Sequence, residues 1–335
     1  MSDELKQALS NYNIDVKSID SLNDDNDVFK VTDDNDQHYF FKIYGMDNDY
    51  DIIPGKRVYH TYEQIQLESE ILMLLSDSTL KTAVPIRNKD GDFVTTLTPD
   101  ADGEAKFATM TTFIDGVVTI HTQAPTAEMA YTAGVSAAQL HLESEKKLLP
   151  IAVQRPHKRQ EYIREIQARL AIGTLTAEQY NMLSQCCDVI VDCMNLLDEE
   201  MKRNVGLVHT DIINGNISYA PDQAVLLDFS RSVYSYYLYD LAEVCLHGSF
   251  GGSSPDLQRA IIQGYHSAKP LTENDLYMMQ VFFVQFLLMI MVLGIESEQN
   301  AWRESVLKWF VDEVHPGLMS GKGYMDPSVF VGILS

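Results

Sequence analysis

Two short stretches in the second half of the chain carry residue types that could do chemistry. Residues 207–217 are LVHTDIINGNI, which places His209, Asp211 and Asn216 in the spacing H-x-D-x4-N. Residues 224–229 are AVLLDF, so Asp228 follows an apolar run a short distance downstream. In phosphoryl transfer a carboxylate orients a hydroxyl group and accepts its proton, while metal ions held by hard oxygen ligands neutralise the phosphate charge. The spacing therefore indicates phosphoryl transfer, with one base, Asp211, and two metal ligands, Asn216 and Asp228.

The elements that must position these residues divide the chain into two parts of different character. Residues 28–32 and 38–44 are rich in aromatic and β-branched residues and flank a DDND turn, which predicts a hairpin with Lys42 on its second strand. A helical pattern follows over about 60–75, and further strands are expected over 93–98 and 106–114.

After residue 116 helical patterns predominate. They lie near residues 124–144, 157–171, 176–203, 237–248, 254–268, 272–294 and 300–314. Thr272 with Asp275, and Asp240 with Glu243, have the spacing of capping boxes at helix starts. The sequence thus predicts an α+β protein, with a small antiparallel sheet lobe and one helix over 1–115, and a larger, mainly helical lobe over 116–335.

The motifs resemble those of the aminoglycoside phosphotransferase, choline kinase and homoserine kinase-like family. LVHTDIINGNI, VLLDF and YDLAEV (239–244) are similar to its catalytic loop ending in Asn, its metal-binding Asp after a strand, and its Asp-Leu-Ala segment opening a helix. AAQLH (137–141) and QGYHS (263–267) extend the similarity over most of the chain. The resemblance implies a bilobal protein-kinase-like fold and transfer of the γ-phosphate of ATP, with Mg²⁺, to a hydroxyl of a small molecule. GTP in place of ATP stays open, as does the acceptor, which would be an amino alcohol, a sugar or an aminoglycoside-like compound.

The resemblance also implies a role for several residues. Asp211 would be the catalytic base in a loop braced by His209, and Asn216 and Asp228 would bind the metal. Arg231, Tyr234 and His247 are candidates for the wall of the acceptor site, although ordinary packing accounts for each of them as well.

The nucleotide would contact the first lobe. Lys42 would bind the phosphates and pair with a glutamate of the following helix. Glu68 and Glu70 differ by about 200° around that helix, so only one of them points inward, and Glu70 fits the family spacing better. Asn26 stands in the turn that covers the phosphates, and Thr112 and Ile114 lie in the segment whose backbone would meet the nucleotide base.

Two departures from the family pattern leave other functions open. The turn LNDDNDVFKV (22–31) contains no glycine and three aspartates, and Thr210 stands where the family usually has glycine. These features motivate a nucleotide-binding, pseudokinase-like module as an alternative. A bacterial Ser/Thr protein kinase of the same fold is another, although no activation loop with D-F-G and A-P-E motifs follows Asp228.

Composition narrows the possible partners and the compartment. The formal charge of −23 repels nucleic acid and anionic membrane surfaces. The apolar stretch 278–295 contains two glutamines, which favours a buried helix over a membrane span. The four cysteines form no CxxC pair, and the first residues do not resemble a secretory signal. We therefore expect a cytoplasmic protein with reduced thiols and a small-molecule partner, acting as a monomer or a homodimer.

Overall fold

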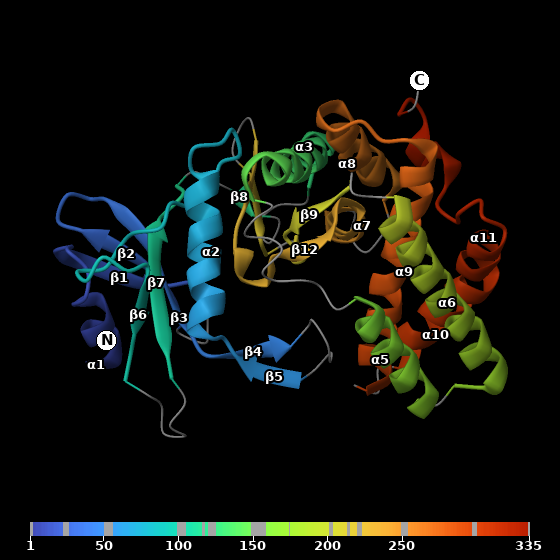
Figure 1. Cartoon of the computed structure of the whole chain (residues 1–335), viewed down its shortest axis with the longest axis horizontal. Helices are drawn as coiled ribbons and strands as arrows, with labels where there is room; N and C mark the ends of the chain where they lie inside the picture. The colour runs from blue at the N-terminus through green and yellow to red at the C-terminus, as the bar shows by residue number, and fades with distance from the viewer. Residues whose placement is uncertain are drawn as a thin grey trace. The chain divides into compact units, whose positions relative to one another are not determined.

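The chain forms two compact units in the computed structural model. One unit comprises Met1–Asn48, Arg57–Val117 and Leu227–Ser230, and the other comprises Asp49–Lys56, Val118–Leu226 and Arg231–Ser335 (Figure 1). The structure describes residues 3–22, 27–49, 56–98, 105–115, 118–119, 125–148, 159–173, 175–200, 204–212, 215–219, 223–248, 254–296 and 300–333.

The first unit is built on a five-stranded antiparallel sheet, as the sequence predicts. Its strand order is β1 (Val16–Ser21), β2 (Val28–Asp33), β3 (His38–Tyr44), β7 (Phe107–Thr112) and β6 (Val94–Thr96). The predicted hairpin is confirmed, because β2 and β3 pair in register from Val28 with Lys42 to Thr32 with His38. Since β3 also pairs with β7, Lys42 lies on a central strand of the sheet.

Two helices accompany this sheet, and a two-stranded ribbon of β4 (Met46–Asp49) and β5 (Lys56–Tyr59) precedes the second of them. α1 (Asp3–Leu9) was not foreseen from the sequence, whereas α2 (Tyr62–Leu75) was, and Thr61 begins it with a complete capping box. Leu5 and Ala8 of α1 pack in one core cluster with Phe41, and Ile43 lies against it. Because side chains alternate along a strand, this packing sends Lys42 to the opposite face of the sheet.

The second unit is mainly helical. Its α-helices are α3 (Ala127–Glu143), α5 (Arg159–Ile172), α6 (Ala177–Glu200), α7 (Tyr237–Gly248), α8 (Pro255–Ala268), α9 (Glu273–Glu296), α10 (Asn300–Trp309) and α11 (His315–Met319). Most of the predicted helical segments agree with these bounds to within a few residues. The last predicted segment, 300–314, is interrupted, because α10 passes into a π-helical turn over Phe310–Val314.

Short strands interrupt the helices where the sequence shows its apolar runs. β9 (Val205–Val208) pairs with β12 (Val233–Tyr236), and β10 (Ile217–Tyr219) pairs with both β11 (Ala224–Leu226) and β8 (Val118–Thr119). The chain therefore leaves β9 at Val208 and enters β10 at Ile217, so the H-x-D-x4-N segment forms the connecting loop.

Helices α3 and α8 lie side by side with their backbones almost in contact (Figure 1). A Cβ atom on Gly134 would lie 1.9 Å from the carbonyl oxygen of Ile261, and one on Gly264 would lie 2.0 Å from that of Tyr131. Only glycine permits this approach at either point. The contact brings the C-terminal ends of both helices, with His141 and Tyr265, close to the N-terminal turn of α7.

Helix α9 contains the long apolar stretch, and its described side chains are largely buried. Thr272 and Asp275 form the predicted capping box at its start, with reciprocal backbone contacts of 2.7 and 3.2 Å. Within the part of the chain that the structure describes, no helix is long and apolar enough to cross a membrane. All four cysteines are buried and none forms a disulfide.

Candidate active site

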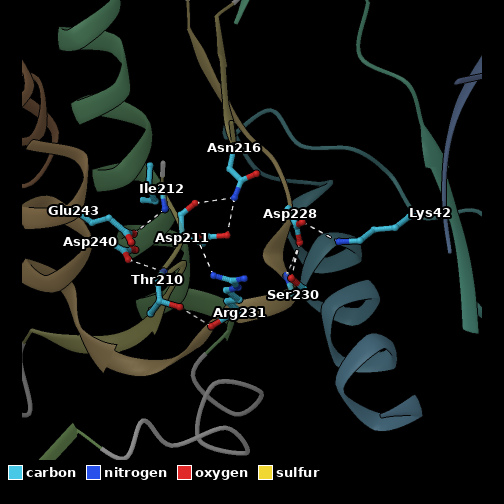
Figure 2. Close-up of polar contacts among 10 residues, drawn as sticks. All are labelled: Lys42, Thr210, Asp211, Ile212, Asn216, Asp228, Ser230, Arg231, Asp240 and Glu243. Atoms are coloured by element: carbon cyan, nitrogen blue, oxygen red, sulfur yellow. Dashed lines mark hydrogen bonds and ion pairs between the residues drawn. The ribbon is translucent and has the colours of Figure 1, made fainter. Parts of the chain in front are cut away.

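The backbone of the loop after β9 is held by two buried carboxylates from the first turns of α7 (Figure 2). Asp240 accepts hydrogen bonds from the amides of His209 (2.7 Å) and Thr210 (2.9 Å), and Glu243 accepts one from the amide of Ile212 (2.7 Å). Three backbone amides bonded to buried side chains of one helix fix the loop in one conformation.

These contacts correct the prediction that Asp240 and Glu243 form a capping box. Strand β12 runs directly into α7, which begins at Tyr237, and the amide of Tyr237 bonds the carbonyl of Asn204 at 3.0 Å. No capping turn exists at Asp240, because the helix already began one turn earlier. Both carboxylates are therefore available to the loop.

Asp240 is also part of a buried polar network. The Nε2 of His141 lies 3.0 Å from Asp240, and its Nδ1 lies 2.8 Å from the hydroxyl of Tyr265. The ring of Tyr237 stacks on His141 with a centroid distance of 4.4 Å. Burial lowers the pKa of His141, so the imidazole is neutral at pH 7 and contacts Asp240 through a hydrogen bond. AAQLH, noted in the sequence for its resemblance alone, thus supports the loop through its histidine.

Thr210 adopts a backbone conformation that usually requires glycine. Its φ is +59°, which is unusual for a β-branched residue. Two hydrogen bonds hold it there, from its amide to Asp240 and from its hydroxyl to the carbonyl of Arg231 at 2.6 Å. The threonine therefore replaces the conformational freedom of glycine with a side-chain contact.

The carboxylate of Asp211 is oriented by two neighbours (Figure 2). The Nδ2 of Asn216 donates to the side chain of Asp211 at 2.8 Å and to its carbonyl at 3.0 Å, and Nη1 of Arg231 lies 3.5 Å from Oδ1. The amide oxygen of Asn216 pairs with no residue that the structure describes. The structure thus brings Asp211 and Asn216 together as predicted, and adds Arg231, which the sequence offered only for the acceptor wall.

Asp228 belongs to the first unit, where it contacts Lys42 (Figure 2). Nζ of Lys42 lies 2.8 Å from Oδ2, while Oδ1 accepts from the hydroxyl of Ser230 at 2.6 Å. Burial alone would raise the pKa of Asp228, but the charge of Lys42 and the bonds from Ser230 lower it well below its usual range. The residue has φ of +60°, a second strained position in the candidate site.

The helix glutamate near Lys42 is Glu68, whereas the sequence pointed to Glu70. Glu68 is buried and accepts a 2.8 Å hydrogen bond from Tyr44, whose ring lies 4.8 Å from Nζ of Lys42. Burial and the charge of Asp228 raise the pKa of Glu68, and Lys42 lowers it. Glu70 bonds Gln66 along the helix. The family spacing could not resolve this choice, whereas the buried Tyr44 on the facing strand does.

The structure treats the other three residues predicted to contact the nucleotide in different ways. Asn26 lies in the segment 23–26, outside the described residues. The amide of Thr112 bonds the carbonyl of Val84 at 2.8 Å, so it is already used within the first unit. Ile114 follows the end of β7, and its backbone makes no hydrogen bond to the described residues. Of the two backbone candidates, Ile114 is therefore the one whose backbone groups are not bonded to the described residues.

Comparisons with known proteins agree with this architecture. Among solved structures, the chain is similar to a microcompartment-associated aminopropanol kinase (19% identity, TM-score 0.72, covering 96% of this chain and 98% of that one). It is also similar to the amicoumacin kinase hAmiN in complex with AMP-PNP, Ca²⁺ and Ami (20%, 0.68, 93% and 94%). A third is an aminoglycoside phosphotransferase from Alicyclobacillus acidocaldarius (13%, 0.62, 95% and 93%). These similarities confirm the kinase-like fold.

The sequence comparisons identify the family. The uncharacterized protein sll1119 of Synechocystis sp. is 24% identical over 243 residues, which are 68% of this chain and 63% of that protein, less than two thirds of its length. The model of the phosphotransferase enzyme family matches residues 19–274, which include Lys42, the Asp211 loop and Asp228. The resemblance drawn from the loop motifs is thereby confirmed, and the chain belongs to the phosphotransferase enzyme family, APH.

Proposed function

We propose that this protein is an ATP- and Mg²⁺-dependent phosphotransferase that moves the γ-phosphate to a hydroxyl group of a small molecule. The observation that carries the proposal is the carboxylate of Asp211, oriented by Asn216 and Arg231 in a loop whose backbone is fixed by buried Asp240 and Glu243. A base held in advance in one orientation is what transfer to a hydroxyl requires, since catalysis of phosphoryl transfer depends on positioning and electrostatics.

In this proposal Asp211 accepts the proton of the attacking hydroxyl. The side chain of Asp211 is 14% exposed, so a substrate can reach it. Arg231 keeps the carboxylate in place and offsets its charge. His209 is fully buried and contributes its backbone amide to Asp240, which supports a bracing role and not proton transfer.

Lys42 would contact the nucleotide phosphates from the central strand of the sheet. Its ammonium group now pairs with Asp228, and both side chains keep partial exposure, 19% and 33%. Because neither side chain is fully buried, a triphosphate can reach Lys42 and compete with Asp228 for its ammonium group. Glu68 lies in the electrostatic surroundings of Lys42 and would pair with it when the phosphates bind.

The residues present fit a hard divalent cation. Asp228 is ionised at all ordinary pH values, and the open amide oxygen of Asn216 is the donor that Mg²⁺ accepts alongside carboxylates. Among the described residues, no group of three or more His, Cys, Asp or Glu side chains could hold a metal on its own. Mg²⁺ would therefore arrive with the nucleotide, and Asp228 of the first unit and Asn216 of the second are the oxygen donors that each unit offers it. The ion would neutralise phosphate charge during transfer.

Two solved structures of similar fold are named as an aminopropanol kinase and an amicoumacin kinase. Together with the family, they favour an amino alcohol or an aminoglycoside-like compound over a protein as the acceptor. A sugar is retained as a third acceptor class. We further propose that the enzyme works in the cytoplasm, where ATP is available.

A phosphate-transfer screen tests the proposal. Labelled ATP or GTP with Mg²⁺ is incubated with amino alcohols, sugars, aminoglycosides, nucleosides and a protein acceptor, and transfer is measured for the native chain and Asp211→Asn. We expect transfer to one small-molecule class and a loss of about 10²–10⁴-fold on removing the base. Nucleotide affinity should be unchanged, because Asp211 does not hold the phosphates.

The matched control is Asp188→Asn, an exposed carboxylate on α6, which should leave transfer intact. Nucleotide binding without Asp211-dependent transfer would contradict the proposal and favour a nucleotide-binding module. Transfer to the protein acceptor alone would favour a protein kinase.

A further inference from the structure

The second unit contains a pocket that takes no part in the proposed reaction. It has a volume of about 220 Å³ and lies between the start of α8, the middle of α9, the end of α10 and the C-terminal segment. Its lining combines three aromatic rings with three polar side chains: Phe283, Trp309, Tyr324, Gln258, Glu313 and Asp326.

The pocket is separate from the Asp211 loop. Within α8, the residue that reaches the network around Asp240 is Tyr265, whereas the pocket is lined by Gln258, two helical turns nearer the N-terminus. Two turns correspond to about 10 Å along the helix. No residue of the Asp211 loop lines the pocket. A ligand in this pocket would therefore not touch the catalytic base.

Tyr324 forms the centre of an aromatic corner. Its ring centroid lies 5.8 Å from that of Trp309 at an interplanar angle of 77°, and 6.4 Å from that of Phe283 at 59°. Rings inclined to each other in this way present faces in more than one direction. Aromatic faces carry negative electrostatic potential and attract cations within about 6 Å.

The corner is fixed by a buried glutamine of α9. The Oε1 atom of Gln280 accepts hydrogen bonds from the amides of both Tyr324 and Met325 at 2.9 Å, and the hydroxyl of Tyr324 donates to the carbonyl of Gln280 at 3.2 Å. Gly323, with φ of +79°, approaches this side chain so closely that a Cβ atom would lie 2.4 Å from it. The wall of the pocket is thus preformed.

Gln258 supplies a polar side chain to the pocket. Its side chain is only 4% exposed and lines the pocket, and its amide makes no hydrogen bond to any residue that the structure describes. Because it lines the pocket, this amide is placed to bond a polar substituent of a ligand there.

Two carboxylates give the pocket its charge. Glu313 accepts a 3.0 Å hydrogen bond from the indole of Trp309, and Asp326 accepts one from the amide of Ser328 at 2.8 Å. The bonds from Ser328 lower the pKa of Asp326, with a smaller contribution from Arg259. Arg259 is itself engaged by the carbonyl of Ser328 and the carboxylate of Asp256.

The cationic side chains of the surroundings do not line the pocket. Lys308 pairs with Asp312 on the exposed side of α10, and neither of them nor Arg259 belongs to the lining residues. Among the residues that the structure describes, the lining therefore carries two negative charges and no positive one.

We propose that this pocket binds a small organic ammonium ion. The aromatic corner and the two carboxylates would stabilise the positive charge, and the amide of Gln258 would bond a polar substituent. The inference does not depend on the proposed phosphotransferase activity, because no pocket residue acts in it.

The test is a titration followed by NMR without nucleotide or metal. The chain has two tryptophans, Trp302 and Trp309, so a Trp309→Phe variant assigns the indole signal of Trp309. The probe is n-butylammonium, which has no hydroxyl to phosphorylate, and neutral butyramide is compared with it. We expect a saturable shift of the Trp309 indole signal with the cation only.

Matched variants locate the charge. Glu313→Gln keeps an acceptor for the indole but removes the charge, and should weaken binding about fivefold or more. Gln258→Leu should change the affinity for ethanolammonium, which carries a polar substituent, more than that for n-butylammonium. Asp312→Asn, one residue away and paired with Lys308, should leave both unchanged.

Three results would overturn the inference. They are the absence of a saturable shift in a folded protein, equal shifts with butyramide, and unchanged affinity in Glu313→Gln. Binding of the probe beside Asp211 would be recognised because Asp211→Asn would weaken it without any shift at Trp309. Since every readout is binding in the absence of nucleotide, failure here is distinct from failure of the phosphate-transfer screen.

Discussion

The candidate residues of the two units are held in different ways. The Asp211 loop in the second unit is anchored through its backbone by Asp240 and Glu243, both buried. The Lys42 cluster in the first unit includes an ion pair between Lys42 and Asp228, whose side chains remain partly exposed, and Ser230 also bonds Asp228. From this difference we infer that the base, Asp211, is fixed before substrates bind, whereas Lys42 can exchange Asp228 for the nucleotide phosphates.

The largest effect is expected where the loop is anchored. Asp240→Ala removes the acceptor of two backbone amides and the partner of the Nε2 atom of His141, three contacts in or beside the buried network. We expect a loss of about 3 kcal/mol or more in the free energy of unfolding. Urea denaturation followed by circular dichroism measures it.

Asp240→Asn keeps an oxygen acceptor of the same size, so it should lose less and allow the comparison if the alanine variant does not fold. The exposed Asp188→Asn should change stability by less than about 0.5 kcal/mol. A small loss in Asp240→Ala would mean that the loop is not anchored from α7.

The Lys42 cluster should respond in the opposite way. Lys42→Met breaks an ion pair with partial exposure, so it should change the free energy of unfolding by about 1 kcal/mol or less. Affinity for ATP, measured by calorimetry, should fall about tenfold or more, because a charge-assisted phosphate contact is lost. Lys30→Met on the adjacent strand removes a lysine that pairs with Asp115, and should leave ATP affinity unchanged. A large loss of stability in Lys42→Met would show that both halves are rigid.

The sequence predicts which residues belong to the candidate site better than it predicts the tertiary contacts that hold them. The strand hairpin, its central Lys42 and the loop with Asp211 and Asn216 follow from residue types and spacing, because alternation and turn chemistry are local properties. The buried hydrogen-bond network behind the loop joins α3, α7 and α8. Because these helices are distant in sequence, local sequence patterns do not predict the network.

Two errors show where local reasoning fails. Asp240 and Glu243 have capping-box spacing, but the start of α7 is set by β12 running into it. The sequence does not distinguish Glu68 from Glu70, and the inward position is decided by Tyr44 on β3, the strand that also carries Lys42. The positive φ of Thr210 was not foreseen either, since it depends on the carbonyl of Arg231.

The two units can also be compared through the pH dependence of stability that their buried glutamates, Glu243 and Glu68, cause. Burial and the charges of Asp211 and Asp240 raise the pKa of Glu243 well above its usual value. The native state then binds a proton more tightly than the unfolded chain, so this residue lowers stability as the pH rises above about 4.3, at up to about 1.4 kcal/mol per pH unit. Glu243→Gln removes that loss while keeping an acceptor for Ile212.

We therefore expect Glu243→Gln to gain stability relative to the native chain as the pH increases from 4.5 to 7, in denaturant unfolding at several pH values. Glu68→Gln should show the same sign but a smaller gain, because Lys42 partly offsets the burial of Glu68. Parallel curves for the native chain and Glu243→Gln would contradict the assignment.

The smallest effect concerns Thr210 and separates backbone strain from side-chain bonding. Thr210→Val keeps a β-branched residue at φ of +59° but removes the hydroxyl that bonds Arg231, and should lose about 1–2 kcal/mol. Thr210→Gly loses the same bond but also relieves strain of about 1–2 kcal/mol, so the two changes largely cancel. In urea unfolding, glycine should therefore lie closer to the native chain than valine. The reverse order would mean that the left-handed backbone at Thr210 costs little, and that the loop owes its rigidity to Asp240 and Glu243 alone.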